Sequence, residues 1–190
     1  HKIEPIWHLI EWLNGMLFGL IYGKRVHRTA QKMLNKTDHP NYDYRMLKEK
    51  DLPELELLLT SQDNDQFRYF KPHKMGNKTL KKLYRNPSFL MMGAFEKTTS
   101  KMVGYFFLRF FLNRTGFIGR MVDQNYQRQG IASRMSEVMY QTLWQNGFKV
   151  RSTISKHNRS ILKLHEQEGR LKVLKELPNE YLYVEIDNPG

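Results

Sequence analysis

Two strongly apolar, aromatic segments that lie close together constrain the fold more than any other feature of this chain. Residues 89–95 and 102–112 are rich in β-favouring side chains, and the polar residues 96–101 between them have the composition of a hairpin loop. A Thr-Gly turn then leads into a third segment of the same kind, residues 117–123. Consecutive strands joined by short turns predict an antiparallel meander.

Helical and strand patterns surround this meander. Apolar side chains at three- and four-residue steps, start signals and stop signals predict helices over residues 51–59, 78–84, 132–144 and 158–168. Short β-favouring runs predict further strands over residues 44–47, 150–155, 171–174 and 181–186. The chain is therefore expected to form a sheet flanked by helices.

The N-terminal segment stands apart from this pattern. Residues 5–22 predict a helix that is apolar nearly all round, and basic residues follow at positions 24, 25, 28 and 32. Polar residues interrupt the apolar run, which is barely long enough to cross a bilayer, so a spanning helix is not expected. Two alternatives stay open: packing on its own domain or a dimer mate, or a peripheral membrane or partner contact.

A linker divides the chain in this interpretation. Residues 37–42 have turn chemistry, with Asp, Asn and Pro close together. Residues 1–36 are then an N-terminal apolar helix with a basic flank. Residues 37–190 are the main domain.

Charge and cysteine content limit the function classes. The chain has 31 Lys and Arg against 19 Asp and Glu, a formal net charge of +12 that favours an anionic partner. The basic residues are spread out, without zinc-finger spacing or Arg/Gly repeats, so nucleic-acid binding is not expected. The lack of cysteine excludes disulfides, thiolate ligands and thiol catalysis. It fits a reducing compartment, so a cytoplasmic location is expected, with membrane association as an open addition.

The segment that carries chemistry is residues 122–133, between a predicted strand and a predicted helix. Backbone N–H groups at such a helix start have no intrahelical acceptor, and with the helix dipole they form an anion site. Gly130 lets the backbone approach a phosphate closely, and Ala132 keeps the first turn slim. Arg128 can add a charge-assisted contact. An ordinary strand–turn–helix connection is the alternative interpretation.

The Gln-Arg-Gln-Gly-Ile-Ala sequence of residues 127–132 resembles the pyrophosphate-binding signature of the GNAT superfamily of acetyl-CoA-dependent N-acyltransferases, Gln/Arg-x-x-Gly-x-Gly/Ala. Val122 and Tyr126 stand where that family often has a valine and an aromatic residue, and Gln124 replaces a common proline. Residues 157–169 resemble the family's later helix, which an asparagine opens and a glycine follows. The resemblance covers roughly residues 42–186 and leaves out the N-terminal helix.

The resemblance implies a fold, a donor and a reaction. The fold is α/β (α+β) and GNAT-like, a mixed, mostly antiparallel central sheet flanked by helices, here with an extra N-terminal helix. Acetyl-CoA would lie between two splayed central strands, with its pyrophosphate on the glycine loop and its pantetheine beside the preceding strand. A free amine would attack the thioester directly, without an acyl-enzyme and without a metal. The cofactor-binding residues that the resemblance implies are Met121, Val122, Asp123, Gln127, Arg128, Gln129, Gly130, Ile131, Ala132, Ser133 and Asn158.

Catalytic residues are less well defined. His165 stands where the family often has a tyrosine that protonates the departing thiolate, and a histidine can act as that acid. The alternative is a helix-surface histidine, with water as the proton source. Asp123, beside the expected thioester, is a candidate general base, or else it pairs with Arg120 or caps a turn. Glu96 is a second candidate base, or else a solvated hairpin residue. His73 lies in the region where such enzymes bind the acceptor, or else it is an exposed loop histidine.

The function expected from the resemblance is acetyl transfer from acetyl-CoA to a primary amine. The positive charge and the aromatic residues of segment 105–111 favour a small-molecule anionic acceptor, with an aminosugar nucleotide as the first candidate. Protein or peptide amines and antibiotics are alternative acceptors, and a non-catalytic acyl-CoA-binding adaptor is an alternative function. Both a monomer and a homodimer are compatible with the sequence.

Overall fold

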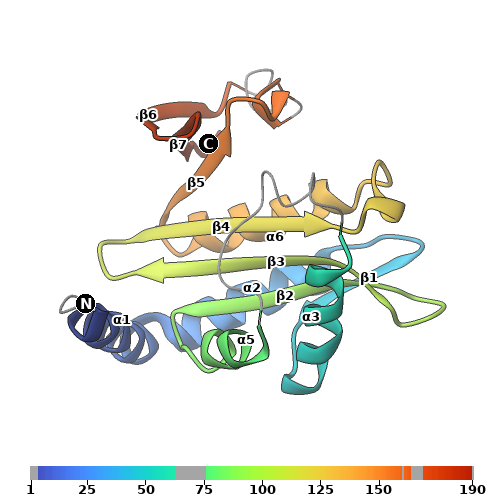
Figure 1. Cartoon of the computed structure of the whole chain (residues 1–190), viewed down its shortest axis with the longest axis horizontal. Helices are drawn as coiled ribbons and strands as arrows, with labels where there is room; N and C mark the ends of the chain where they lie inside the picture. The colour runs from blue at the N-terminus through green and yellow to red at the C-terminus, as the bar shows by residue number, and fades with distance from the viewer. Residues whose placement is uncertain (1–3, 63–75, 160, 164–168, 190) are drawn as a thin grey trace.

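A computed structural model of the chain describes residues 4–62, 76–159, 161–163 and 169–189. Within these ranges the central element is a seven-stranded sheet with the order β1-β2-β3-β4-β5-β7-β6 (Figure 1). Neighbouring strands are antiparallel except β4 and β5, so the expected mixed, mostly antiparallel sheet is confirmed. The strands are β1 (Tyr42–Met46), β2 (Phe89–Glu96), β3 (Met102–Phe111), β4 (Thr115–Val122), β5 (Lys149–Ser155), β6 (Leu171–Leu177) and β7 (Tyr181–Ile186).

Strands β2, β3 and β4 form the predicted meander, and helices cover both of its faces. Helices α2 (Lys24–Lys36) and α6 (Ile131–Gln145) lie on one face, and α3 (Leu52–Thr60) and α5 (Asn77–Tyr84) lie on the other (Figure 1). Because helices cover both faces, β2 is buried from Phe89 to Phe95 and β3 at most positions, which explains their nearly continuous apolar sequence. Short 3₁₀ turns, η2 (Glu49–Asp51) and η3 (Gln124–Tyr126), complete this part of the chain.

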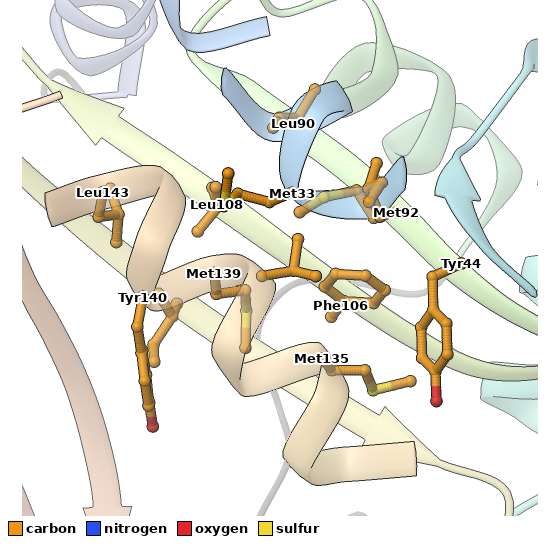
Figure 2. Close-up of a cluster of buried hydrophobic side chains, with 14 of the residues drawn as sticks. Met33, Tyr44, Leu90, Met92, Phe106, Leu108, Met135, Met139, Tyr140 and Leu143 are labelled. Carbon is orange, nitrogen blue, oxygen red and sulfur yellow. The ribbon is translucent and has the colours of Figure 1, made fainter. Parts of the chain in front are cut away.

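The larger core lies between the sheet and α2 and α6. Figure 2 shows Met135 and Met139 of α6 facing Phe106 of β3, with Met33 of α2 beside them. Period-two alternation sends Phe106 to this side and Phe107 to the other core, under α3 and α5.

The N-terminal helix continues further than the sequence pattern predicted. Helix α1 (Glu4–Phe18) passes through a π-helical turn, η1 (Gly19–Gly23), directly into α2, so the basic flank is itself helical. In α2 the apolar residues recur at three- and four-residue steps, and Val26, Ala30, Met33 and Leu34 are therefore buried against the sheet. The expected division at residue 36 coincides with the end of this helical run and stays a prediction. In the part of the chain that is described, no helix is long and apolar enough to span a membrane.

The sheet opens between its two parallel strands. Strands β4 and β5 pair only through Thr115–Lys149, Gly116–Val150 and Phe117–Arg151. Beyond Phe117 the strands diverge, and β5 turns away to pair with β7 (Figure 1). The second half of β4 is therefore left with one unpaired edge, which faces the opening.

Candidate active site

A cleft of about 1250 Å³ occupies this opening. Gln127, Arg128 and Gly130 line one end of the cleft, while Glu11 and Arg109 line the other. The volume exceeds the roughly 300–1,000 Å³ of ordinary small-molecule pockets, so an extended ligand and a second reactant both have room.

The glycine loop forms one mouth of the cleft. Gly130 precedes α6 with a φ of 78°, and an added Cβ would have no atom within 4 Å, so the space above the backbone is open. The N–H of Arg134 donates to Gly130 O at 3.2 Å, which makes it the first intrahelical bond. The N–H groups of residues 131–133 precede that bond and have no intrahelical acceptor, so they suit an anionic group. The residues present therefore fit a phosphate-bearing donor.

Gln129 holds this loop to the sheet edge. Its side-chain oxygen accepts a hydrogen bond from the phenol of Tyr42, and its carbonyl accepts one from His39 Nε2 at 3.1 Å. Burial, with smaller effects of Glu96 and Tyr126, raises the pKa of Tyr42, so the phenol remains a donor. Gln129 does not line the cleft, and its described contacts are those of an anchor for its neighbours.

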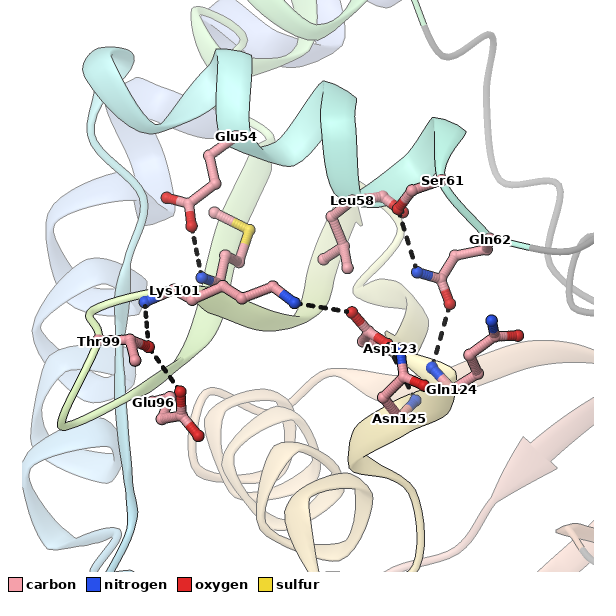
Figure 3. A network of polar contacts seen from close by, with 11 residues as sticks. Glu54, Leu58, Ser61, Gln62, Glu96, Thr99, Lys101, Asp123, Gln124 and Asn125 are labelled. Carbon is pink, nitrogen blue, oxygen red and sulfur yellow. Dashed lines mark hydrogen bonds and ion pairs between the residues drawn. The ribbon is translucent and has the colours of Figure 1, made fainter.

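Asp123 caps a turn. Its Oδ1 accepts from both the backbone N–H and the side-chain amide of Asn125, at 3.0 and 3.1 Å. Its Oδ2 lies 3.6 Å from Lys101 Nζ, so the ion pair is with Lys101 and not with Arg120 (Figure 3). Asp123 as a whole is 4% exposed and does not line the cleft. These contacts are those of a turn cap, one of the alternative roles expected for Asp123 from the sequence. General-base catalysis by Asp123 stays a prediction.

Glu96 flanks the same β2–β3 turn as Lys101, and its N–H donates to Lys101 O at 2.9 Å. Its Oε2 accepts from Thr99 Oγ1 at 2.6 Å within the β2–β3 turn (Figure 3). It is not among the residues that line the cleft. Glu96, the second candidate base, is thus a residue of the β2–β3 hairpin, and its catalytic role stays a prediction.

The pairing of β4 decides which backbone groups face the opening. The N–H of Asp123 donates to Val103 O at 2.8 Å, and Met121 is opposite Tyr105 in β3. Because antiparallel pairs alternate, the backbone groups of Met121 and Asp123 face β3, and those of Arg120 and Val122 face the opening. Of the three predicted strand residues, only Val122 offers its backbone there, while Met121 lines the cleft. Arg120 was not predicted at this position.

The start of the predicted helix 158–168 lies at the cleft: residues 159 and 161–163 are helical, and residues 160 and 164–168 lie outside the described residues. Asn158 lines the cleft, and its Oδ1 accepts from the N–H of Ile161 at a long 3.4 Å. Ser133, Ile131 and Ala132 also line the cleft, from the start of α6. His165 and His73 lie outside the described residues.

The far end of the cleft carries charged residues that sequence analysis did not select. Arg109 Nη2 lies 2.7 Å from Glu11 Oε1, so an ion pair joins β3 to α1 there. Four cationic side chains line the described cleft, and Glu11 is the one acidic side chain among the described lining residues. Arg109 interrupts an otherwise apolar strand, and that interruption was a usable signal. The four are Lys82, Arg109, Arg120 and Arg128.

A mixed sheet split between two parallel strands, with a glycine loop and a helix start at the mouth of the split, defines a class of proteins with an anion-binding site beside an open cleft. The model of the acetyltransferase (GNAT) family matches residues 56–169, more than half of the chain. The chain belongs to that family. Acetyl transfer is thus its general chemistry.

Solved structures agree on the fold. Ribosomal-protein-S5-alanine acetyltransferase from Vibrio fischeri is similar with a TM-score of 0.65 and 15% identity, over 80% of this chain and 97% of that one. PaiA N-acetyltransferase from Thermoplasma acidophilum, solved in complex with coenzyme A, is similar with a TM-score of 0.57 and 13% identity, over 77% and 99%. No curated protein sequence matches the chain. In the described residues, no group of His, Asp and Glu side chains could hold a metal ion.

Proposed function

We propose that this protein is an N-acetyltransferase that binds acetyl-CoA in the cleft between β4 and β5. One observation carries the proposal: the open backbone cradle at Gly130 lies at the mouth of a cleft lined by the unpaired edge of β4. Family membership supplies the general reaction, and the cleft supplies a place for it.

Different residues of the cleft bind different parts of acetyl-CoA. The N–H groups of residues 131–133 bind the pyrophosphate, and Arg128 contributes a cation at the same mouth. The backbone edge of Arg120 and Val122 binds the pantetheine arm and polarises the thioester carbonyl. The nitrogen of the free amine then bonds to the carbonyl carbon while the carbon–sulfur bond breaks, and the nitrogen gives one proton to water. The thiolate takes a proton, for which His165 remains the proposed source.

The acceptor in this proposal is a small anionic primary amine. The described lining holds four cationic side chains against Glu11, and Arg109 is already paired with that carboxylate. An excess of positive potential in a cleft concentrates anionic substrates. Aminosugar nucleotides combine the required amine with phosphate charge. A protein amine is the second candidate, because the similar Vibrio fischeri enzyme is a ribosomal-protein-S5-alanine acetyltransferase.

Donor binding is tested by isothermal titration with acetyl-CoA. The wild-type protein is expected to bind in the micromolar range, about −8 kcal/mol. Gly130→Glu places a carboxylate in the cradle and is expected to abolish binding. Gly147→Glu is the matched control, because Gly147 has a similar φ of 75° and equally open surroundings but lies after the other end of α6. Equal losses in both variants, or a wild-type protein that fails to bind, would refute the proposed site.

The acceptor is tested by a screen that measures release of free thiol. Aminosugar nucleotides are expected to react and uncharged amines to react poorly. Arg120→Gln is expected to raise the KM for the anionic acceptor, whereas Arg114→Gln, an exposed turn residue, should not. Reaction of peptides alone would replace the acceptor proposal with the protein alternative. Donor binding without turnover of any amine would favour the adaptor function.

A further inference from the structure

Helix α1 has the reverse polarity of an ordinary surface helix, with its apolar side outward and its polar side toward the domain. Its polar side chains point inward: Asn14 Nδ2 donates to Phe110 O at 3.0 Å, and Glu11 pairs with Arg109. Apart from the buried Phe18, the large apolar side chains between positions 9 and 21 are exposed, and we call them the apolar ridge: Leu9, Ile10, Trp12, Leu13, Met16, Leu17, Leu20 and Ile21. Its most exposed members are Leu20 at 78% and Trp12 and Ile21 at 61%. A soluble helix normally shows the opposite polarity.

The helix is fixed in this orientation by close packing. A Cβ on Gly15 would lie 2.6 Å from Asn86 Oδ1, and a Cβ on Gly19 would lie 2.9 Å from Pro87 Cβ, so α1 and η1 approach the Asn86–Pro87 turn closely. Phe18 stacks on Phe110 with ring centroids 4.7 Å apart. The inner side of the helix is therefore satisfied by its own domain, and the apolar ridge is left for an external partner. Contiguous apolar surfaces of this kind mark interaction sites.

Basic side chains continue the ridge along the same helical run. Lys24, Arg28 and Lys32 are exposed, and we call them the basic ridge. They lie at four-residue steps within α2, on the side away from the buried Val26, Ala30 and Met33. Helix α2 contains no acidic residue. The outward side of residues 9–36 is thus apolar at one end and cationic at the other.

We propose that the apolar ridge and the basic ridge together dock this protein on an anionic membrane surface. Interfacial helices bury an apolar face at the boundary between headgroups and acyl chains and bind anionic headgroups through Lys and Arg. A second copy of the chain would cover only the apolar ridge and leave the basic ridge unmatched. An anionic lipid surface matches both. Glu11, on the inner side of the same helix, lines the cleft, so docking brings that end of the cleft toward the headgroups.

Co-sedimentation of the full chain with vesicles tests the proposal. At low salt, the protein is expected to sediment with phosphatidylcholine/phosphatidylserine vesicles and much less with phosphatidylcholine alone. Serine substitutions in the apolar ridge are expected to abolish sedimentation, while the same substitutions at exposed apolar positions elsewhere leave it unchanged. The ridge variant is Leu17→Ser/Leu20→Ser/Ile21→Ser, and the control variant is Leu57→Ser/Val173→Ser/Leu174→Ser.

Charge is tested separately. Each basic residue near an anionic surface contributes about 1 kcal/mol, so removing the basic ridge is expected to weaken partitioning by about two orders of magnitude. Acetyl-CoA binding and the circular dichroism spectrum of each variant show that it is folded. The charge variant is Lys24→Gln/Arg28→Gln/Lys32→Gln, and the control variant is Lys50→Gln/Lys78→Gln/Lys81→Gln.

Three results would overturn the proposal. One is a wild-type protein that stays in solution with anionic vesicles at low salt. Another is a ridge variant that sediments as the wild type does. The third is a wild-type dimer that the ridge substitutions dissociate while neither protein binds vesicles, which would assign the apolar ridge to self-association.

Discussion

The phenol of Tyr42 donates a hydrogen bond to the side-chain oxygen of Gln129, which lies 87 positions further along the chain. This contact joins the edge strand β1 to the glycine loop. It leaves Gln129 directed away from the cleft, while its neighbours Arg128 and Gly130 line it. The proposed donor site therefore depends on a strand that contributes no residue to the lining of the cleft.

Removing this contact should loosen the loop. Tyr42→Phe deletes one hydrogen bond, which is worth about 1 kcal/mol, so acetyl-CoA binding is expected to weaken about fivefold. Isothermal titration measures the change. Tyr44→Phe is the control, because Tyr44 also lies in β1 but its hydroxyl is buried without a hydrogen-bond partner among the described residues. Equal effects of the two substitutions would show that the contact with Gln129 does not position the loop.

Tyr44 should make the protein sensitive to alkaline pH. Burial raises the pKa of Tyr44 to about 12, from 10.0, with a smaller contribution from Tyr42 and an opposing one from Arg134. Because the pKa of Tyr44 is higher in the folded state than in the unfolded state, this group leaves the free energy of unfolding unchanged below pH 10. The free energy of unfolding then falls as pH rises from 10 toward 12. The loss is on the order of 2–3 kcal/mol.

Urea unfolding across this pH range tests the prediction. Tyr44→Phe should show a shallower decline than the wild type above pH 10. At neutral pH the substitution should be neutral or stabilising, because it removes a buried hydroxyl without a described partner. Strong destabilisation at neutral pH would instead indicate a partner for the hydroxyl.

Asp51 should control stability at acidic pH. Its buried carboxylate accepts from Arg45 Nη1 at 2.6 Å and from the backbone N–H of Lys48 at 2.7 Å. Burial acts to raise its pKa, but these hydrogen bonds outweigh that effect and lower the pKa below its usual 3.8. The stability is therefore present above pH 3.8 and is lost as pH falls through the lowered value.

Asp51→Asn should cost about 1–3 kcal/mol at neutral pH and flatten the acid limb of the stability curve. Chemical denaturation between neutral pH and pH 3 measures both effects. Asp43→Asn is the control, since the Asp43 carboxylate is exposed and lies 3.8 Å from Lys97 Nζ. A control that behaves like Asp51→Asn would remove the special role of the buried pair.

Glycine-to-alanine substitutions should act in opposite directions at two positions. A Cβ on Gly119 would lie 2.4 Å from Phe107 Cε1, and that ring is fixed by stacking on Phe89, so Gly119→Ala is expected to destabilise by about 1–3 kcal/mol. A Cβ on Gly23 would meet only Phe18 O, at 4.0 Å, so Gly23→Ala is expected to stabilise by about 0.5–1 kcal/mol. Thermal unfolding compares the two, and shifts of the same sign would contradict the packing argument.

Local signals predicted much of the fold. The aromatic segments, the polar hairpin residues 96–101 and the glycine before α6 each act over a few neighbouring residues, and the structure confirms the meander and the strand–loop–helix unit that they predict. Helix α2 was missed because its basic composition concealed the regular spacing of Val26, Ala30 and Met33. The roles of individual site residues were harder to predict, since Asp123 and Gln129 obtain their partners from distant segments.

The sequence by itself determined the order of the elements, the open backbone at Gly130 and the family, because each depends on backbone preferences and side-chain patterns within a short window. Only the tertiary structure decided the divergence of β4 from β5, the pairing of Arg109 with Glu11 and the outward direction of the apolar ridge. These features join residues that are far apart in the chain. Their geometry depends on strand register and packing across the whole core, which no local pattern encodes.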